Sequence, residues 1–139
     1  MPRASSSSCQ RHAAIRRRQF ALYDEAVERL AGVTPIARDT RDTHAHHLFA
    51  VRIDPERAGA DREAYMAALA AEGIATSIHF LPVHRLQWYA ERFPDQAPLP
   101  VAERAGDELL SLPVSPAHSE DDIREVVAAL ERVHERLTP

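Results

Sequence analysis

The sequence predicts an α+β domain in which a small sheet is covered by helices on one side. Two observations carry this prediction. Stretches with the apolar spacing of a helix alternate with short stretches rich in β-branched and aromatic residues, which are typical of strands. Only 4 glycines occur in the 139 residues, and no predicted strand is followed by a glycine-rich turn. A doubly wound nucleotide-binding fold is therefore not expected.

The first third of the chain contains a predicted tail, a helix and two strands. Residues 1–9, MPRASSSSC, are predicted to form a disordered tail, because so few apolar side chains cannot offset the entropy lost on ordering. A helical apolar period begins at Arg11, and Gly32 is suited to end the helix. Strands are predicted at residues 33–36 and 47–53, the second rich in β-branched and aromatic residues.

The remaining elements follow in chain order. Alternation in residues 74–80 predicts a strand. It turns Ile78 and Phe80 toward the core, and Ser77 and His79 the other way. Before this strand, a helix capped by Asp61 is expected to run through Glu72 and stop at Gly73. After it, we expect a short helix at residues 85–92, a Pro-rich loop at 93–100, a helix at 101–110 and an extended segment at 110–113. A final amphipathic helix is capped by Ser119.

Composition narrows the function classes. The net charge of −4 argues against a nucleic-acid binder, which needs a concentrated basic surface. Apolar runs are too short to span a membrane, and the polar N-terminus has no secretory signal. A lone Cys9 cannot form an internal disulfide, which favours a reducing compartment. The chain is therefore expected in the cytoplasm.

All 17 positively charged side chains are arginine, so the sequence contains no lysine. Chemistry that needs a side-chain primary amine, such as a lysine Schiff base or a P-loop lysine, is therefore excluded from this polypeptide.

Histidine is frequent, with 8 residues, and five of them form two clusters. His44, His46 and His47 precede or open a predicted strand. In a strand, His44 and His46 would share a face, which permits a metal pair, although no third ligand can be named. Polar packing at the start of the strand is the other interpretation.

The second cluster contains His79 and His84. In a regular strand, Ser77 and His79 share the face opposite Thr76, so a hydroxyl and an imidazole could together bind a sugar hydroxyl or a phosphate oxygen. The pattern alone favours a structural role for His79. No serine lies in a G-x-S-x-G motif, so no sequence motif supports a hydrolase function.

Read together, several blocks resemble the end of the DegT/DnrJ/StrS aminotransferases, over roughly residues 10–137. Their order and spacing carry the resemblance. The blocks are HAHHLFAVR (44–52), GIATSIHFLPVH (73–84), WYAERFP (88–94), LPVAE (99–103), LSLPVSP (110–116) and the closing amphipathic helix, preceded by RRRQFALY (16–23).

The resemblance implies the C-terminal small domain of a fold-type I pyridoxal-phosphate enzyme, with a mainly antiparallel sheet. Residues 10–32 would be the family's linking helix and 33–139 the small domain. Such enzymes aminate a nucleotide-linked keto sugar, usually with glutamate as donor, and act as dimers. Their aldimine lysine and phosphate-binding loop belong to a large domain whose motifs are missing here. By the resemblance, His79 lines the substrate side of the cleft, with His84 and Ser77 as further substrate-binding candidates.

The resemblance implies no catalytic, cofactor-binding or metal-binding residue in this chain, and pyridoxal phosphate is not expected to be bound by it alone. The leading interpretation is part of an enzyme, inactive alone, from a truncated gene, a longer reading frame or a split enzyme. A non-enzymatic module that docks on a full-length relative and a histidine-rich metal-binding protein remain open. An exposed apolar patch, where the large domain would pack, is expected around Phe20 or Tyr23 of the linking helix.

Overall fold

The computed structural model describes residues 6–39, 44–78 and 80–139. Helix α1 spans Ser6–Val27. It therefore begins before the predicted start at Arg11 and includes the last residues of the segment predicted to be a disordered tail. Gly32 follows the helix with a positive φ of 78°, in agreement with its predicted role in ending it.

In the part of the chain that the structure describes, four short strands form one antiparallel sheet, as the family resemblance implies. The spatial order is β1-β2-β4-β3, and every neighbouring pair is antiparallel. The strands are β1 (Val33–Pro35), β2 (Phe49–Ile53), β3 (Ser77–Ile78) and β4 (Leu109–Leu112). The two-residue strand β3 therefore lies at one edge of the sheet.

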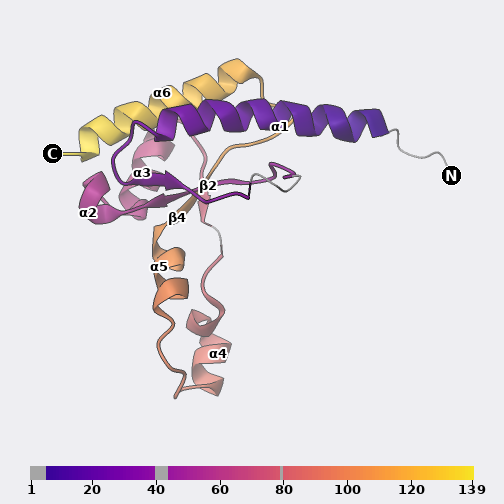
Figure 1. Cartoon of the computed structure of the whole chain (residues 1–139). Coiled ribbons are helices and arrows are strands. Elements are labelled where there is room, and N and C mark those ends of the chain that lie inside the picture. Colours follow the sequence, from indigo (N-terminus) through magenta and orange to yellow (C-terminus); the bar gives the residue numbers. More distant parts are fainter. Residues whose placement is uncertain (1–5, 40–43, 79) are drawn as a thin grey trace.

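The core lies between the sheet and three helices. In β2 the side chains of Phe49, Val51 and Ile53 are buried and the two between them are only half-buried, so one face of the strand packs inward. Helices α1 and α6 (Glu120–Leu137) lie side by side over the sheet, with α3 (Arg62–Ala71) next to α6 (Figure 1). Each fully buried Leu or Phe contributes about 1.5–3 kcal/mol, which makes this layer the main source of stability.

Local capping chemistry sets the ends of these helices as predicted. Asp61 accepts a hydrogen bond from the backbone N–H of Ala64 at 2.9 Å. Ser119 and Asp122 form a reciprocal capping box, with bonds of 3.1 and 2.7 Å to each other's backbone N–H. Gly73 follows α3 in the left-handed region at φ 80°.

A short helix that the sequence pattern does not predict, α2 (Pro55–Ala58), follows β2. Asp54 caps it through the backbone N–H of Glu56 at 3.2 Å, and Pro55 occupies the first turn. Gly32 packs directly against it, because a Cβ at position 32 would lie 2.4 Å from the backbone nitrogen of Ala58.

Residues 80–108 project away from the sheet, and we call them the arm (Figure 1). The arm contains the 3₁₀ turn η1 (Val83–Arg85) and helices α4 (Gln87–Arg92) and α5 (Pro100–Glu108). Gly106 is its only buried residue. At the base of the arm, the buried Arg62 donates a hydrogen bond to the Gly106 carbonyl, and Pro82 lies so close to Gly106 that a Cβ there would meet its ring at 2.4 Å.

Two predictions about side-chain direction are wrong. Ile78 is 42% exposed and Phe80 is 84% exposed, rather than facing the core. Phe80 lies outside the strand and takes a left-handed φ of 48°, which breaks the alternation on which the prediction depended. Conversely, Phe20 and Tyr23 are buried and do not form an exposed patch. Their rings pack on Phe49 of β2, at centroid distances of 4.9 and 4.8 Å.

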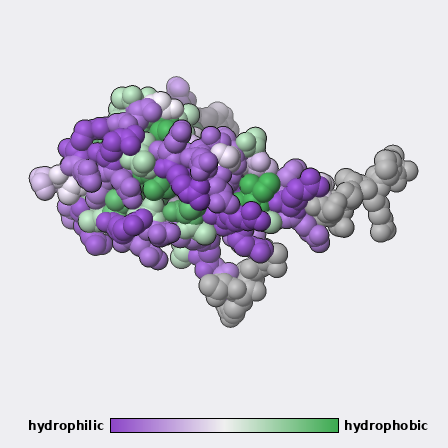
Figure 2. All heavy atoms as spheres, turned by 90° about the horizontal axis from the view of Figure 1, so that it is seen from above, coloured by the Kyte–Doolittle hydropathy of each residue, from purple (hydrophilic) through white to green (hydrophobic). Residues whose placement is uncertain are grey.

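Seen from above, the outer face formed by α1 and α6 is mostly hydrophilic, with small hydrophobic areas between charged side chains (Figure 2). This agrees with the amphipathic pattern of α6, whose inward stripe contains Ile123, Leu130 and Val133. In the part of the chain that the structure describes, no helix is long and apolar enough to cross a membrane.

Candidate functional site

Two of the predicted site residues are described by the structure, Ser77 at the edge of the sheet and His84 in the arm. Ser77 is in β3, paired with Ser111 of β4, and its side chain is exposed. Thr76, just before the strand, is half-buried. His79 lies outside the described residues, so its predicted position on the substrate side remains a prediction.

His84 lies in the arm, in η1. Its side chain is 20% exposed, and its Nε2 is 3.3 Å from Glu103 Oε1 of α5. The same carboxylate oxygen accepts a hydrogen bond from the backbone N–H of Leu99 at 3.0 Å, at the start of α5. The imidazole therefore lies between the two halves of the arm. Nothing in the sequence indicated Glu103 as its partner, because the contact exists only once the arm folds back on itself.

A hollow of about 440 Å³ lies within the arm beside His84. This volume is in the range of small-molecule and side-chain pockets, and its wall is mostly apolar. The lining residues are Pro82, Val83, His84, Tyr89, Phe93, Gln96, Leu99 and Ala102. Ser77 is not among them, so the structure does not bring the two described candidates into one pocket.

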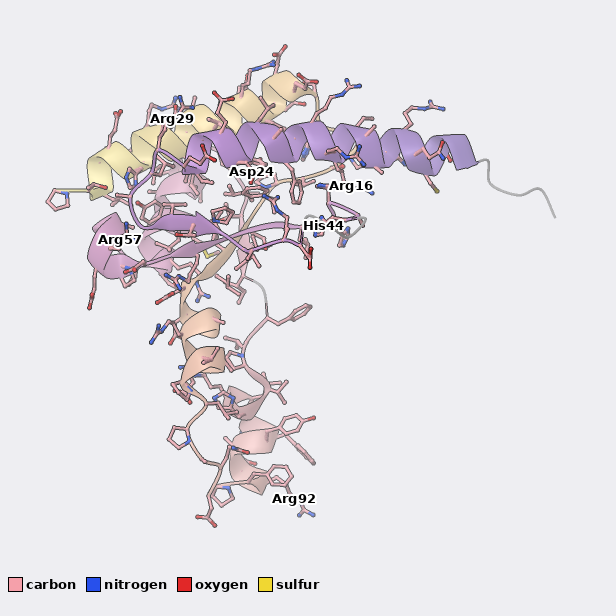
Figure 3. The ribbon with its side chains drawn as sticks, in the orientation of Figure 1. Arg16, Asp24, Arg29, His44, Arg57 and Arg92 are labelled. Atoms are coloured by element: carbon pink, nitrogen blue, oxygen red, sulfur yellow. The ribbon has the colours of Figure 1, made fainter. Side chains whose placement is uncertain are left out.

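His44 lies beside α1 rather than in a strand (Figure 3), and the rings of His44 and His46 both lie near Phe20 of that helix. The strand starts at Phe49, and His46 has a positive φ of 52°, so His44 and His46 do not share a strand face. His44 Nδ1 accepts a hydrogen bond from the His46 backbone N–H at 2.9 Å. The two rings meet edge-on at 4.7 Å, and Phe20 meets His46 at the same distance.

This packing changes the chemistry of the cluster. Burial, followed by the neighbouring charge of His44, lowers the pKa of His46 and favours its neutral form. His47 is exposed. Within residues 6–39, 44–78 and 80–139, no group of three or more His, Cys, Asp or Glu side chains could hold a metal ion. In the described residues, the rings of His44 and His46 pack against each other, and that of His46 packs on Phe20.

A second hollow, of about 290 Å³, adjoins this cluster and includes Arg38, His44 and Phe20 in its wall. The Arg38 guanidinium lies 5.1 Å from the Phe20 ring centroid and pairs with Asp24. Arg38 is therefore committed to a contact within the domain. Its position depends on the packing of α1 against the sheet, so the sequence pattern offered no signal for it.

The fold and the arm correspond to one class of protein. The sugar aminotransferases share this α+β domain: aminotransferase TlmJ from Streptoalloteichus hindustanus matches with a TM-score of 0.82 and 25% identity, over 94% of this chain and 34% of that one. DesI, solved in the presence of its TDP-sugar product, matches with a TM-score of 0.81 and 36% identity, over 90% of this chain and 32% of that one. S. venezuelae DesV, solved with a ketimine intermediate, matches with a TM-score of 0.79 and 28% identity, over 90% of this chain and 32% of that one.

The model of the DegT/DnrJ/EryC1/StrS aminotransferase family matches residues 6–131. The chain belongs to this family. It spans about a third of the length of the solved structures that it matches.

Proposed function

We propose that this chain is the small-domain part of a pyridoxal-phosphate aminotransferase that acts on a nucleotide-linked keto sugar, with glutamate as amino donor. The observation that carries the proposal is the family match over residues 6–131. The 36% identity with DesI, whose structure was solved with a TDP-sugar product, supports the substrate class.

The residues of this chain do not fit a covalent pyridoxal-phosphate site. The cofactor supplies an electron sink for amino transfer when a lysine holds it, and the 139 residues contain no lysine. Any activity therefore needs a large domain that carries the lysine, in a homodimer of longer chains or on an associated chain. Alone, this chain is expected to be inactive.

Within such an enzyme, we assign substrate contacts to His79 and Ser77 and a weaker one to His84. The exposed position of Ser77 at the edge of the sheet supports contact with a group outside the domain. His84 is held by Glu103, so its effect on the substrate would come through the shape of the arm. These side chains would hold a sugar hydroxyl or an anionic group by hydrogen bonds.

A second candidate is a non-enzymatic module that docks on a full-length relative. Two observations favour it: the sequence has no lysine, and apolar side chains are exposed on the arm. In that case the chain would modulate a partner enzyme without contributing to amino transfer.

The experiment that tests the aminotransferase proposal is a chimaera. The part of DesI upstream of the matched segment is joined to this chain, and TDP-sugar binding is measured by calorimetry beside amino transfer from glutamate. We expect the chimaera to bind the TDP-sugar. His79→Ala should weaken binding about tenfold, as expected for a lost hydrogen bond, with Ser77→Ala in the same direction.

His47→Ala is the matched control, because His47 is an exposed histidine outside the proposed site. Thermal unfolding of each variant separates loss of binding from loss of fold. A folded chimaera that binds no TDP-sugar would support the docking module instead. If His79→Ala lowers stability and leaves affinity unchanged, His79 has a structural role.

A further inference from the structure

The arm is attached to the rest of the domain only at its base. It connects β3 to β4, which are neighbours in the sheet, so its two ends leave the body side by side (Figure 1). Within residues 80–108 only Gly106 is buried. Apolar burial therefore does little to fix the direction of the arm, which depends instead on contacts at the base.

Arg62, the first residue of α3, makes such a contact. Its side chain is 7% exposed, although a guanidinium stays charged at any physiological pH. Nε and Nη2 donate hydrogen bonds to the two carboxylate oxygens of Glu63, at 2.9 and 2.6 Å. This bidentate pair holds the plane of the guanidinium and turns Nη1 toward the arm.

The Nη1 atom of Arg62 caps the C-terminal end of α5. It donates a hydrogen bond to the backbone carbonyl of Gly106 and lies 3.4 Å from the carbonyl of Leu109. Gly106 is in the last turn of α5, where carbonyls lack partners within the helix and the helix dipole is negative. The last turn of α5 has no basic residue of its own. The capping charge therefore comes from α3, and the same contact fastens the arm to the body.

The contact point lies where the two chain segments of the arm meet. Pro82, on the other segment, packs so closely on Gly106 that a Cβ there would collide with its ring. Further out, Arg85 of η1 pairs with Asp107 of α5. A movement of α5 about its end would therefore carry η1 with it, and with η1 the neighbouring His84.

A second polar contact at the base is weaker. Arg52 Nε of β2 lies 3.1 Å from Glu108 Oε2, at the last residue of the arm. The Arg52 side chain is 42% exposed, and water weakens such a pair. A buried guanidinium, in contrast, would be left without a hydrogen-bond partner if the arm moved away, which costs far more. The contact of Arg62 is therefore the one that resists movement of the arm.

We propose that Arg62 is a positioning residue: it fixes the direction of the arm relative to the sheet, and so sets where His84 lies relative to Ser77. The consequence for substrate binding rests on the proposed function, whereas the anchoring of the arm does not. The two parts are tested by separate experiments.

The anchoring is tested on the full chain by time-resolved energy transfer from Trp88, the only tryptophan, to an acceptor dye on Cys9, the only cysteine. Trp88 is in the arm and Cys9 is an exposed residue of α1, so the distribution of distances between them reports how freely the arm moves. We expect Arg62→Met to broaden this distribution. Hydrogen exchange in α5 should speed up at least about tenfold more than that in α6, because the change is local.

Arg132→Met is the matched control, because Arg132 pairs with Glu72 at 2.7 Å in the body and should leave the distances unchanged. Glu63→Gln removes the charge that orients Arg62, and should broaden the distribution less than Arg62→Met does. The side chain of Glu63 is 65% exposed, so this variant keeps its fold and decides the question if Arg62→Met does not fold. An unchanged distribution in the folded variants of Arg62 and Glu63, or equal broadening in Arg132→Met, would overturn the anchoring.

The consequence for the substrate is tested in the chimaera with the upstream part of DesI, by calorimetry with the TDP-sugar. We expect Arg62→Met to weaken binding about tenfold, and Arg62→Lys to recover part of the loss, because lysine can still donate to the Gly106 carbonyl. Arg132→Met should bind like the wild type.

Unchanged affinity in Arg62→Met, together with a broadened distance distribution, would overturn the role of Arg62 in binding and retain its role as an anchor. A wild-type chimaera that binds no TDP-sugar would contradict the proposed function, and with it the role of Arg62 in binding. The distance measurement on the full chain still decides the anchoring in that case.

Discussion

At the scale of single residues, Gly32 and Gly73 have nearly the same backbone conformation and very different surroundings. Both have φ near +80°, where any side chain is strained by about 1–2 kcal/mol. At Gly73 a Cβ would meet nothing within 4 Å, whereas at Gly32 it would lie 2.4 Å from the backbone of Ala58. Of the two glycines, only Gly32 lies where the backbones of two elements approach closely.

Alanine substitutions at the two glycines should therefore differ in cost. We expect Gly73→Ala to lower the free energy of unfolding by about 1 kcal/mol, from backbone strain alone. Gly32→Ala should cost about 3 kcal/mol or more, because α2 must also move away. Urea unfolding of both variants measures the difference. Equal losses of unfolding free energy in the two variants would show that α2 moves away from position 32 without a cost in stability.

At the scale of elements, α3 and α6 are joined at one end by a buried hydrogen-bond network. The Tyr65 hydroxyl of α3 lies 2.7 Å from Nδ1 of His134 in α6 and 3.1 Å from the Ala58 carbonyl. His134 is 8% exposed, and burial lowers its pKa from the ordinary value of 6.5. Because the Tyr65 hydroxyl donates its hydrogen to the Ala58 carbonyl, its oxygen can accept a hydrogen bond from Nδ1–H of the His134 ring.

This network makes the stability of the helix pair depend on pH. Above pH 6.5 His134 is neutral in both the folded and the unfolded chain, and its contribution is fully present. As the pH falls below 6.5, the unfolded chain binds a proton first, so the free energy of unfolding decreases until the pH passes the lowered folded pKa. His46, whose pKa is also lowered, contributes in the same direction.

We therefore expect His134→Gln to reduce the slope of unfolding free energy against pH just below 6.5, while the Gln amide N–H can still donate to the Tyr65 hydroxyl oxygen. Urea unfolding at a series of pH values gives the slope. Part of the slope that remains in the variant belongs to His46, and a second substitution there should reduce it further. A His134→Gln variant with the wild-type slope would contradict the assignment.

At the scale of the whole molecule, the chain is divided between a packed body and an exposed arm (Figure 1). Helix α6 buries Ile123, Leu130 and Val133 in the core, whereas α4 has no buried residue. Local stability follows buried apolar contacts, so the arm should open independently of the sheet.

Hydrogen exchange of the full chain checks this division. We expect amides in α6 and β2 to exchange only through global unfolding, and those in α4 to be less protected by at least about 2 kcal/mol. Protection of α4 that equals that of α6 would show that the arm and the body unfold as one unit.

Local chemistry made much of this fold predictable. The caps Asp61 and Ser119 and the apolar stripe of α6 depend on neighbours a few residues away, so the pattern located those helices. The strand at residues 74–80 was predicted too long, because alternation alone does not show where pairing ends. Among the described residues, β3 pairs with β4 at Ser77 and Ile78.

The sequence by itself determined the family, the α+β class and the absence of any lysine that could hold pyridoxal phosphate. These properties depend on composition and on the order of blocks along the chain. The tertiary structure alone decided that Phe20 is buried against β2 and that His84 meets Glu103 within an exposed arm. Such contacts join residues far apart in the chain, and the burial of a side chain depends on which distant element covers it.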